Sequence, residues 1–339
     1  MNKKILYSAL WVVGCWLTGC AIFFTASIYT RWFDTTIRNT TSTATVWSKA
    51  MTNNGSSTIK PTETCKTGTC KIGAISLYVQ DSIPVHIYYP LDAGQQASVV
   101  IFSHGYATDC SVYTFIINDL VAHGYVVICI DHPGIAKKVV LPNGEKIVYQ
   151  KPVFADTQDK QNKTCMALDQ YITNIDTVYN QVKEWNEQVD HIVYNRINMQ
   201  NCIVMGHSLG GAASMAYGHY NKNISGSISL DGFYAPWNTT KTNTIPCLYL
   251  SAEPKRTTQQ ARLTAVQAQA IQNNISLQII PGADHNAFCD AIFWNKVKRW
   301  WYAAIVPVGN ITAEVGVPVI TKHIRAFCAS QPYNNKINN

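Results

Sequence analysis

Short apolar runs rich in β-branched residues alternate with longer amphipathic stretches from Ile72 onward, and this rhythm constrains the fold more than any other feature. Short, mostly apolar runs of this kind are expected of strands buried on both faces of a sheet. Two runs that open the series, 75–79 and 85–89, predict an antiparallel pair. The six runs that follow are Val99–Phe102, Val126–Ile130, Cys202–Met205, Ile228–Leu230, Leu248–Leu250 and Leu277–Ile280.

Helical segments are predicted between these strands. They are Val112–Ala122, Met166–Asp190, Leu209–Tyr220, Thr258–Asn273 and Ala287–Ile305. Alternation of this kind predicts an α/β fold whose central sheet is mainly parallel, with helices on both faces. The composition, 47% hydrophobic and 14% charged, excludes a largely disordered chain. The net charge of +7 is spread along the chain, with no Lys/Arg block longer than a pair, which argues against a nucleic-acid partner.

One segment, residues 132–163, breaks the alternation. Two extended runs lie around Asn143-Gly144 within it, and this dipeptide predicts a β-hairpin over residues 139–148. The segment follows the end of a strand, where open α/β sheets bind their ligands. Two interpretations remain open: a lid or pocket wall, and an insertion without a functional role.

The sequence Gly206-His207-Ser208-Leu209-Gly210 lies between a predicted strand and a predicted helix. This is the G-x-S-x-G pattern of a nucleophile elbow, in which a strained turn exposes the serine hydroxyl above the sheet. Side chains at the two glycine positions would collide within so sharp a turn. We therefore predict that Ser208 is a nucleophile and not part of a chance Gly/Ser turn.

A serine hydroxyl needs a base to take its proton, and the base needs a carboxylate to orient it. His285 follows the last predicted strand, which is the position that this architecture requires of the base. Two carboxylates compete for the third place, and we favour Asp231, directly at a strand end, over Glu253, which precedes cations in a loop. Asp284 is expected to point away from the ring of its neighbour.

The oxyanion hole requires two backbone N–H groups that face the developing negative charge. One is predicted at Leu209, directly after the nucleophile. The second is predicted at Tyr106, in the loop Ser103-His104-Gly105-Tyr106 after the strand 99–102. His104 and His207 are interpreted as loop scaffolding. Chemistry of this kind calls for neither a metal nor another cofactor.

The N-terminus has the parts of an export signal: two lysines, an apolar run and small residues. Leu17-Thr18-Gly19-Cys20 resembles the lipobox of bacterial lipoproteins, which predicts a signal peptide over residues 1–19 and lipidation of Cys20. Residues 20–71 are predicted to be a membrane tether and a Ser/Thr-rich stalk, and residues 72–339 a catalytic domain. Because the apolar run continues to Tyr29, an uncleaved signal anchor and plain secretion remain alternatives. All three interpretations predict that the catalytic domain is exported.

Eleven cysteines are consistent with an oxidising compartment. Cys65 with Cys70, Cys110 with Cys165, and Cys289 with Cys328 are our suggested disulfides, although spacing alone does not define connectivity. The cysteines within predicted strands, at positions 129, 202 and 247, are interpreted as small buried hydrophobic residues.

Four motifs occur together in one order: Phe102–Gly105, Gly206–Gly211, Ser229–Gly232 and Gly282–Phe288. In this they resemble the plasma-type platelet-activating factor acetylhydrolases and related bacterial lipases of the α/β-hydrolase fold. The resemblance spans about residues 72–301. It implies Asp231 as the acid, because that family takes the carboxylate from the strand after the nucleophile helix.

The resemblance further implies calcium-independent hydrolysis of short or oxidised acyl esters, typically on phospholipids. A polyesterase or cutinase-like enzyme and a general short-chain lipase are the enzymatic alternatives, and a surface lipoprotein that only binds is the non-enzymatic one. An acyl pocket could be lined by five aromatic residues, namely Tyr106, Phe233, Tyr234, Trp237 and Phe288. Trp294, Trp300 and Trp301 could contact a membrane or pack on the sheet.

Overall fold

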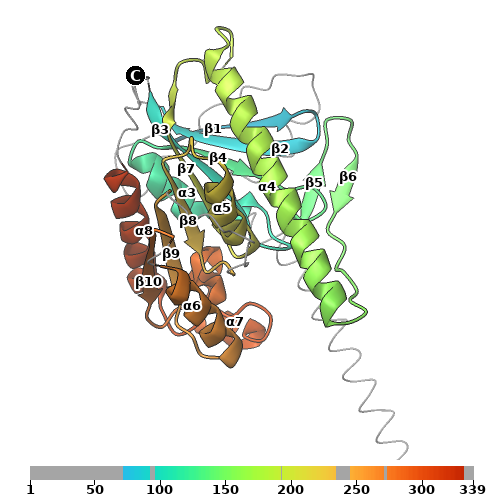
Figure 1. Ribbon diagram of the computed structural model, residues 1–339, viewed down its shortest axis with the longest axis vertical. Helices are drawn as coiled ribbons and strands as arrows, with labels where there is room; N and C mark the ends of the chain where they lie inside the picture. The colour runs from blue at the N-terminus through green and yellow to red at the C-terminus, as the bar shows by residue number, and fades with distance from the viewer. Residues whose placement is uncertain (1–71, 92–95, 192, 234–244, 271–272, 332–339) are drawn as a thin grey trace, which may run out of the picture. The chain divides into compact units, whose positions relative to one another are not determined.

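The computed structural model describes residues 72–331, apart from 92–95, 192, 234–244 and 271–272. The predicted signal peptide, Cys20, the stalk and the pair Cys65–Cys70 therefore lie outside the described residues. Eight strands form the main sheet, in the order β1-β2-β4-β3-β7-β8-β9-β10 (Figure 1). Their bounds are β1 Ile72–Val79, β2 Ile83–Pro90, β3 Ala97–Ser103, β4 Val126–Ile130, β7 Ile197–His207, β8 Gly226–Leu230, β9 Cys247–Ala252 and β10 Ile275–Ile280.

The sheet is mainly parallel. β1 pairs antiparallel with β2, and β2 pairs antiparallel with β4, whereas every pair from β4 to β10 is parallel. All eight predicted strands are present, including the antiparallel pair at the start. Because the carboxyl ends of parallel strands lie along one edge, the loops after β3, β7, β8 and β10 meet there.

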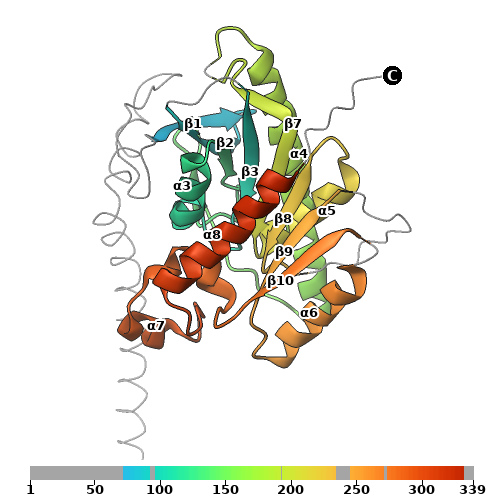
Figure 2. The same ribbon diagram turned by 90° about the vertical axis from the view of Figure 1, so that its left-hand side faces the viewer.

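Helices cover both faces of the sheet, as predicted. Along β3, Val100 and Phe102 join one buried cluster, and Val99 and Ile101 join the other. Successive side chains of the strand point to opposite faces of the sheet, so β3 contributes to the hydrophobic core on each face. The helices are α3 Thr114–Ala122, α4 Thr157–Glu187, α5 Leu209–Tyr220, α6 Thr257–Ala270, α7 Lys296–Tyr302 and α8 Ala313–Ser330. Helix α8 crosses the face opposite α4 (Figure 2).

The helices of the C-terminal region differ from the prediction. Residues 287–305 form two 3₁₀ turns and then α7, because Cys289 and Trp294 adopt extended backbone conformations that interrupt a helix. Helix α8 was not predicted, since Gly316 and Pro318 both disfavour helix interiors. A Cβ at Gly316 would lie 2.6 Å from the end of the Ile292 side chain, so a larger residue there would require that side chain to shift.

Helix α4 begins nine residues before the predicted start. Asp156 caps it, with its carboxylate accepting a hydrogen bond from the Asp159 N–H at 2.8 Å. The irregular segment after β4 is correspondingly shorter than predicted. It contains the predicted hairpin, which is formed by β5 (Lys138–Val140) and β6 (Lys146–Val148).

The disulfide pairing was wrong for two of the three suggested bridges. Cys110 is bonded to Cys129, so Cys129 is not a free hydrophobic residue. The chain that leaves β3 crosses the end of β4, where the Cys110 N–H donates to Asp131 at 2.9 Å, and this brings the two sulfurs together. Three cysteines of the suggested bridges, Cys165, Cys289 and Cys328, have free thiols. Cys202 and Cys247 are buried and free, as predicted.

None of the helices within the described residues combines the length and the apolar character needed to cross a membrane.

Candidate active site

Ser208 occupies the turn between β7 and α5, with φ of 56° and ψ of −115°. A positive φ is uncommon for a residue with a side chain, and a strained backbone of this kind is typical of functional sites. The turn is tight: a Cβ on Gly210 would lie 2.6 Å from the His104 carbonyl oxygen, and one on Gly206 would lie 2.5 Å from the Gly210 oxygen. Both glycines are therefore needed to fold the turn that presents the hydroxyl.

His285 lies in the loop after β10 and reaches both other members of the predicted triad. Its Nε2 is 3.0 Å from Ser208 Oγ, and its Nδ1 is 2.6 Å from Asp231 Oδ2. Because an ionised carboxylate only accepts, Nδ1 carries the ring hydrogen and Nε2 is free to accept the serine proton. The structure thus brings together three residues that are 54 and 77 positions apart in the chain.

Asp231 follows β8 and is 4% exposed. Its Oδ1 accepts a hydrogen bond from the Ala252 N–H at 2.9 Å, which leaves Oδ2 for His285. Arg262 on α6 donates to the Asp231 carbonyl oxygen at 3.2 Å, and its guanidinium lies 3.6 Å from Oδ2. The carboxylate is therefore held in one orientation by a backbone group and a cation. Sequence reasoning missed Arg262, because nothing in the sequence pattern of α6 relates it to β8.

The other two carboxylates have different partners. Glu253 accepts a hydrogen bond from the Gly282 N–H at 2.9 Å, so it braces the loop that precedes His285. Asp284 accepts from the His285 N–H at 2.7 Å and from the side chain of Gln259 at 2.9 Å. Neither of these carboxylates hydrogen-bonds to the imidazole ring.

The loop after β3 passes beside the nucleophile. A Cβ on Gly105 would lie 3.3 Å from the Cβ of Ser208, which places the Gly105–Tyr106 peptide next to the serine. The Gly105 N–H donates to the Tyr113 hydroxyl at 2.8 Å. Leu209, the other predicted donor, is buried at the start of α5. Tyr113 was not singled out in the sequence, because an aromatic in an apolar stretch is usually a core residue.

Two histidines beside the site are buried and have lowered pKa values. Burial, aided by the neighbouring His285, lowers the pKa of His207 to about 3. Burial also lowers the pKa of His104, whose Nδ1 donates to the Gly105 carbonyl oxygen at 2.6 Å. Both histidines are thus neutral at physiological pH. They make hydrogen bonds within the loops around Ser208, in agreement with the scaffolding role predicted from the sequence.

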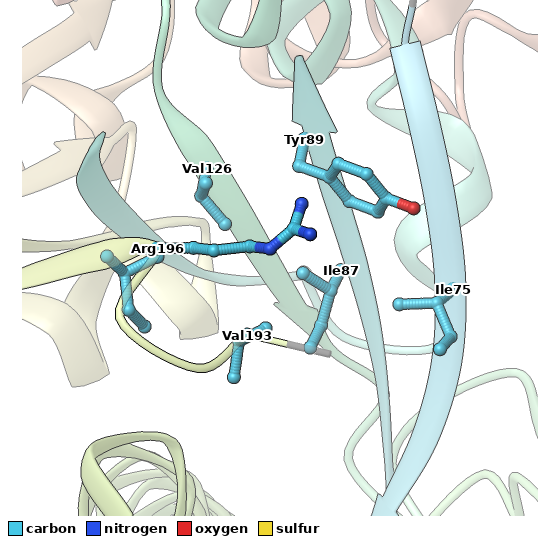
Figure 3. A pocket seen from close by; sticks show the side chains of 7 residues that line it. Ile75, Ile87, Tyr89, Val126, Val193 and Arg196 are labelled. Carbon is cyan, nitrogen blue, oxygen red and sulfur yellow. The ribbon is translucent and has the colours of Figure 1, made fainter. Parts of the chain in front are cut away.

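The predicted acyl-pocket aromatics are only partly at the site. Tyr106 is 37% exposed, and its ring meets that of Tyr149 edge-on at 5.4 Å. Phe288 is fully buried and Phe233 packs against the core, whereas residues 234 and 237 lie outside the described residues. A separate pocket, lined by Ile87, Tyr89 and Arg196 among others, lies near the start of β7 (Figure 3). Because Ser208 follows the other end of that strand, this pocket is not part of the candidate site.

No group of three or more His, Cys, Asp and Glu side chains suited to a metal ion occurs within the part of the chain that the structure describes.

Comparisons with known proteins agree with the geometry. A family model described as platelet-activating factor acetylhydrolase, isoform II, matches residues 11–139, and one described as serine aminopeptidase, S33, matches residues 94–240. The platelet-activating factor acetylhydrolase of Cavia porcellus is 21% identical over 270 residues, which cover 74% of this chain and 61% of that protein. The chain thus matches less than two thirds of the length of that relative.

A solved structure shares the fold. The ferulic acid esterase from Streptomyces cinnamoneus superposes with a TM-score of 0.58 at 16% identity, over 77% of this chain and 89% of that one. The mainly parallel sheet, the strained serine turn between β7 and α5, and the two family matches lead to one assignment. The chain has the α/β-hydrolase fold and is similar in sequence to the platelet-activating factor acetylhydrolases.

Proposed function

We propose that this protein is a carboxylic ester hydrolase that works through an acyl-enzyme on Ser208. The observation that carries the proposal is the continuous hydrogen-bonded line from Ser208 Oγ through the His285 ring to Asp231. Each atom of this line has the donor or acceptor character that proton transfer requires. The His285 side chain is 28% exposed, so solvent and substrate can approach the ring.

The reaction proceeds in two halves. His285 Nε2 takes the proton of Ser208 Oγ as the oxygen attacks the ester carbonyl carbon, and the N–H groups of Leu209 and Tyr106 stabilise the resulting oxyanion. The imidazolium then returns its proton to the departing alkoxide, which leaves as the alcohol. Water attacks the acyl-enzyme with the same base, and the acid product leaves as Ser208 recovers its hydrogen. Asp231 stabilises the imidazolium in both halves.

We infer that the substrates are short-chain acyl esters of phospholipid type. The relative from Cavia porcellus is named for activity on platelet-activating factor. Exposed apolar side chains support a lipid surface as the place of reaction. Trp300 and Trp301 on α7 are 74% and 66% exposed, and Phe293, Val297 and Ile305 are also exposed. Large exposed apolar patches mark interaction sites.

Helix α7 is closely tied to the loop of the proposed base. Arg299 donates hydrogen bonds to the carbonyl oxygens of Ile292 and Ile311, on either side of the helix. The segment after α7 binds the His285 loop directly, since the Asp284 N–H donates to the Val308 oxygen at 2.9 Å. A lipid surface bound at α7 would therefore present ester groups near His285.

Export and membrane attachment belong to the same proposal. The N-terminal signal and the lipidated Cys20 would hold the catalytic domain on the outer side of a membrane, where phospholipid esters are accessible. The Cys110–Cys129 disulfide supports this location, because disulfides persist in oxidising compartments. Labelling with a radioactive fatty acid should be lost when Cys20 is replaced by Ala; retained labelling contradicts lipidation at that residue.

The central experiment is the hydrolysis of p-nitrophenyl butyrate by the purified protein and by Ser208→Ala. We expect the variant to lose all measurable turnover and all labelling by a fluorophosphonate, with an unchanged thermal unfolding midpoint. Turnover that survives the substitution would rule out the serine mechanism. A wild-type protein that neither hydrolyses esters nor reacts with the probe would instead favour a surface lipoprotein that only binds.

A substrate panel separates the enzymatic alternatives. We expect acetylated phospholipid to be preferred over tributyrin and over a polyester film, which represent a general lipase and a polyesterase. The double substitution Trp300→Ser with Trp301→Ser should slow hydrolysis in phospholipid vesicles but leave the rate on soluble p-nitrophenyl acetate unchanged. Equal effects on both substrates would contradict a lipid-docking role for α7.

A further inference from the structure

A buried chain of hydrogen bonds connects the two loops that flank Ser208, and it lies outside the proton-transfer line. His207 Nε2 is 2.9 Å from the carbonyl oxygen of His285. Because a carbonyl oxygen only accepts, Nε2 carries the ring hydrogen and Nδ1 has the free lone pair. The Tyr113 hydroxyl is 3.0 Å from that Nδ1 and donates to it.

The chain continues to the loop of the predicted oxyanion hole. The Tyr113 oxygen accepts a hydrogen bond from the Gly105 N–H at 2.8 Å. Hydrogen bonds thus run from Gly105 through Tyr113 and His207 to the backbone of His285. Tyr113 is fully buried and His207 is 3% exposed. Burial raises the pKa of the tyrosine and lowers that of the histidine, so both side chains stay neutral and keep this order of donors and acceptors.

We propose that Tyr113 and His207 are positioning residues that fix the distance between the oxyanion-hole peptide and the general base. The inference rests on the proposed function. At one end, the chain holds Gly105, whose neighbour Tyr106 supplies the predicted N–H to the oxyanion. At the other end, it holds the main chain of His285, the residue whose ring takes the serine proton.

The packing around Gly105 leaves little freedom for another arrangement. A Cβ at this position would lie 3.1 Å from His207 Nδ1 and 3.2 Å from the Tyr113 hydroxyl. Loss of the hydroxyl would leave the Gly105 N–H and His207 Nδ1 buried without this partner. The loop would then shift to satisfy them, and the oxyanion N–H would move with it. The hydrogen bond from this N–H to the oxyanion strengthens in the transition state. Its loss should therefore lower kcat and change KM little.

Tyr113→Phe tests the proposal, with Tyr217→Phe as the matched control. The control also removes a buried hydroxyl, one that donates to Asp176 at 2.9 Å from the last turn of α5. We measure kcat and KM for p-nitrophenyl butyrate per active site titrated with a fluorophosphonate, so that unfolded protein is not counted. We expect Tyr113→Phe to lower kcat about 10- to 100-fold with KM within about threefold, and the control to stay within about twofold of wild type.

His207→Gln provides a second variant in case Tyr113→Phe does not fold. Glutamine keeps an N–H for the His285 carbonyl but removes the ring nitrogen that accepts from Tyr113, so kcat should fall to a similar extent. If the two residues act as one chain, the double variant should be no more than about threefold slower than the slower single variant. If the reduction of kcat in the double variant equals the product of the reductions in the two single variants, the coupling of the two residues is refuted.

Two outcomes separate this inference from the proposed function. A wild-type protein that is active, with Tyr113→Phe within about twofold of the control, overturns the positioning role alone. A wild-type protein that is inactive and unlabelled overturns the proposed function, and the inference with it.

Discussion

Asp231→Asn tests the most specific feature of the site, the orientation of the proposed base. An asparagine of nearly the same shape must direct its oxygen toward one neighbour and its NH₂ group toward the other. The Ala252 N–H, 2.9 Å from Oδ1, can only donate and therefore requires the oxygen. The guanidinium of Arg262, 3.6 Å from Oδ2, is beyond hydrogen-bond distance of that atom and does not reverse the choice.

The NH₂ group then faces His285 Nδ1, which is 2.6 Å from Oδ2 in the native site. His285 Nδ1 must then accept a hydrogen bond from that NH₂ group. The imidazole therefore changes tautomer, and its hydrogen moves to Nε2. In that tautomer Nε2 has no lone pair for the proton of Ser208. We expect kcat to fall about 10⁴-fold, which corresponds to about 5 kcal/mol of transition-state stabilisation.

The assay is hydrolysis of p-nitrophenyl butyrate near neutral pH, with Glu253→Gln as the control. Glu253 accepts from the Gly282 N–H, and a glutamine oxygen can do the same, so we expect its kcat within about threefold of wild type. The opposite ranking of the two variants would move the acid to Glu253. An Asp231→Asn variant that keeps a tenth or more of the activity would refute the tautomer argument.

Three further predictions concern stability, each measured by urea unfolding. Gly210→Ala should destabilise the fold by about 3 kcal/mol, because its Cβ would lie 2.6 Å from the His104 carbonyl oxygen; an unchanged midpoint would contradict the tight turn. Replacing Cys110 and Cys129, 19 residues apart, by Ala should cost about 3 kcal/mol, and dithiothreitol should weaken the wild type but not this variant. Because the pKa of His207 is lowered to about 3, the unfolded chain binds a proton between about pH 6.5 and 3 that the folded protein does not, so stability falls as the pH falls. Between pH 6 and 5, His207→Gln should therefore lose about 1.2 kcal/mol less than the wild type; equal losses would contradict a neutral buried histidine.

Much of the fold and of the candidate site could be predicted from the sequence. Apolar runs identified all eight strands of the main sheet. Burial on both faces excludes polar residues most fully from central strands such as β4, in which all five residues are apolar and buried. Ser208, Asp231 and His285 each follow such a run. Since parallel strands end at one edge of the sheet, chain order alone predicted that these residues would meet. The continuous helix predicted over residues 287–305 was wrong, because Cys289 and Trp294 adopt extended backbone conformations.

The residues at strand ends can be identified from the sequence alone, and with them the alcohol, the imidazole and the carboxylate that could meet. Three pairs of contacting residues became known from the packing of distant segments: Cys110 with Cys129, Asp231 with Arg262, and Gly105 with Tyr113. Periodicity and turn signals arise from neighbours along the chain and are visible in the sequence. Side-chain partners from distant segments depend on how whole strands and helices pack, and no local sequence pattern predicts which of these residues come into contact.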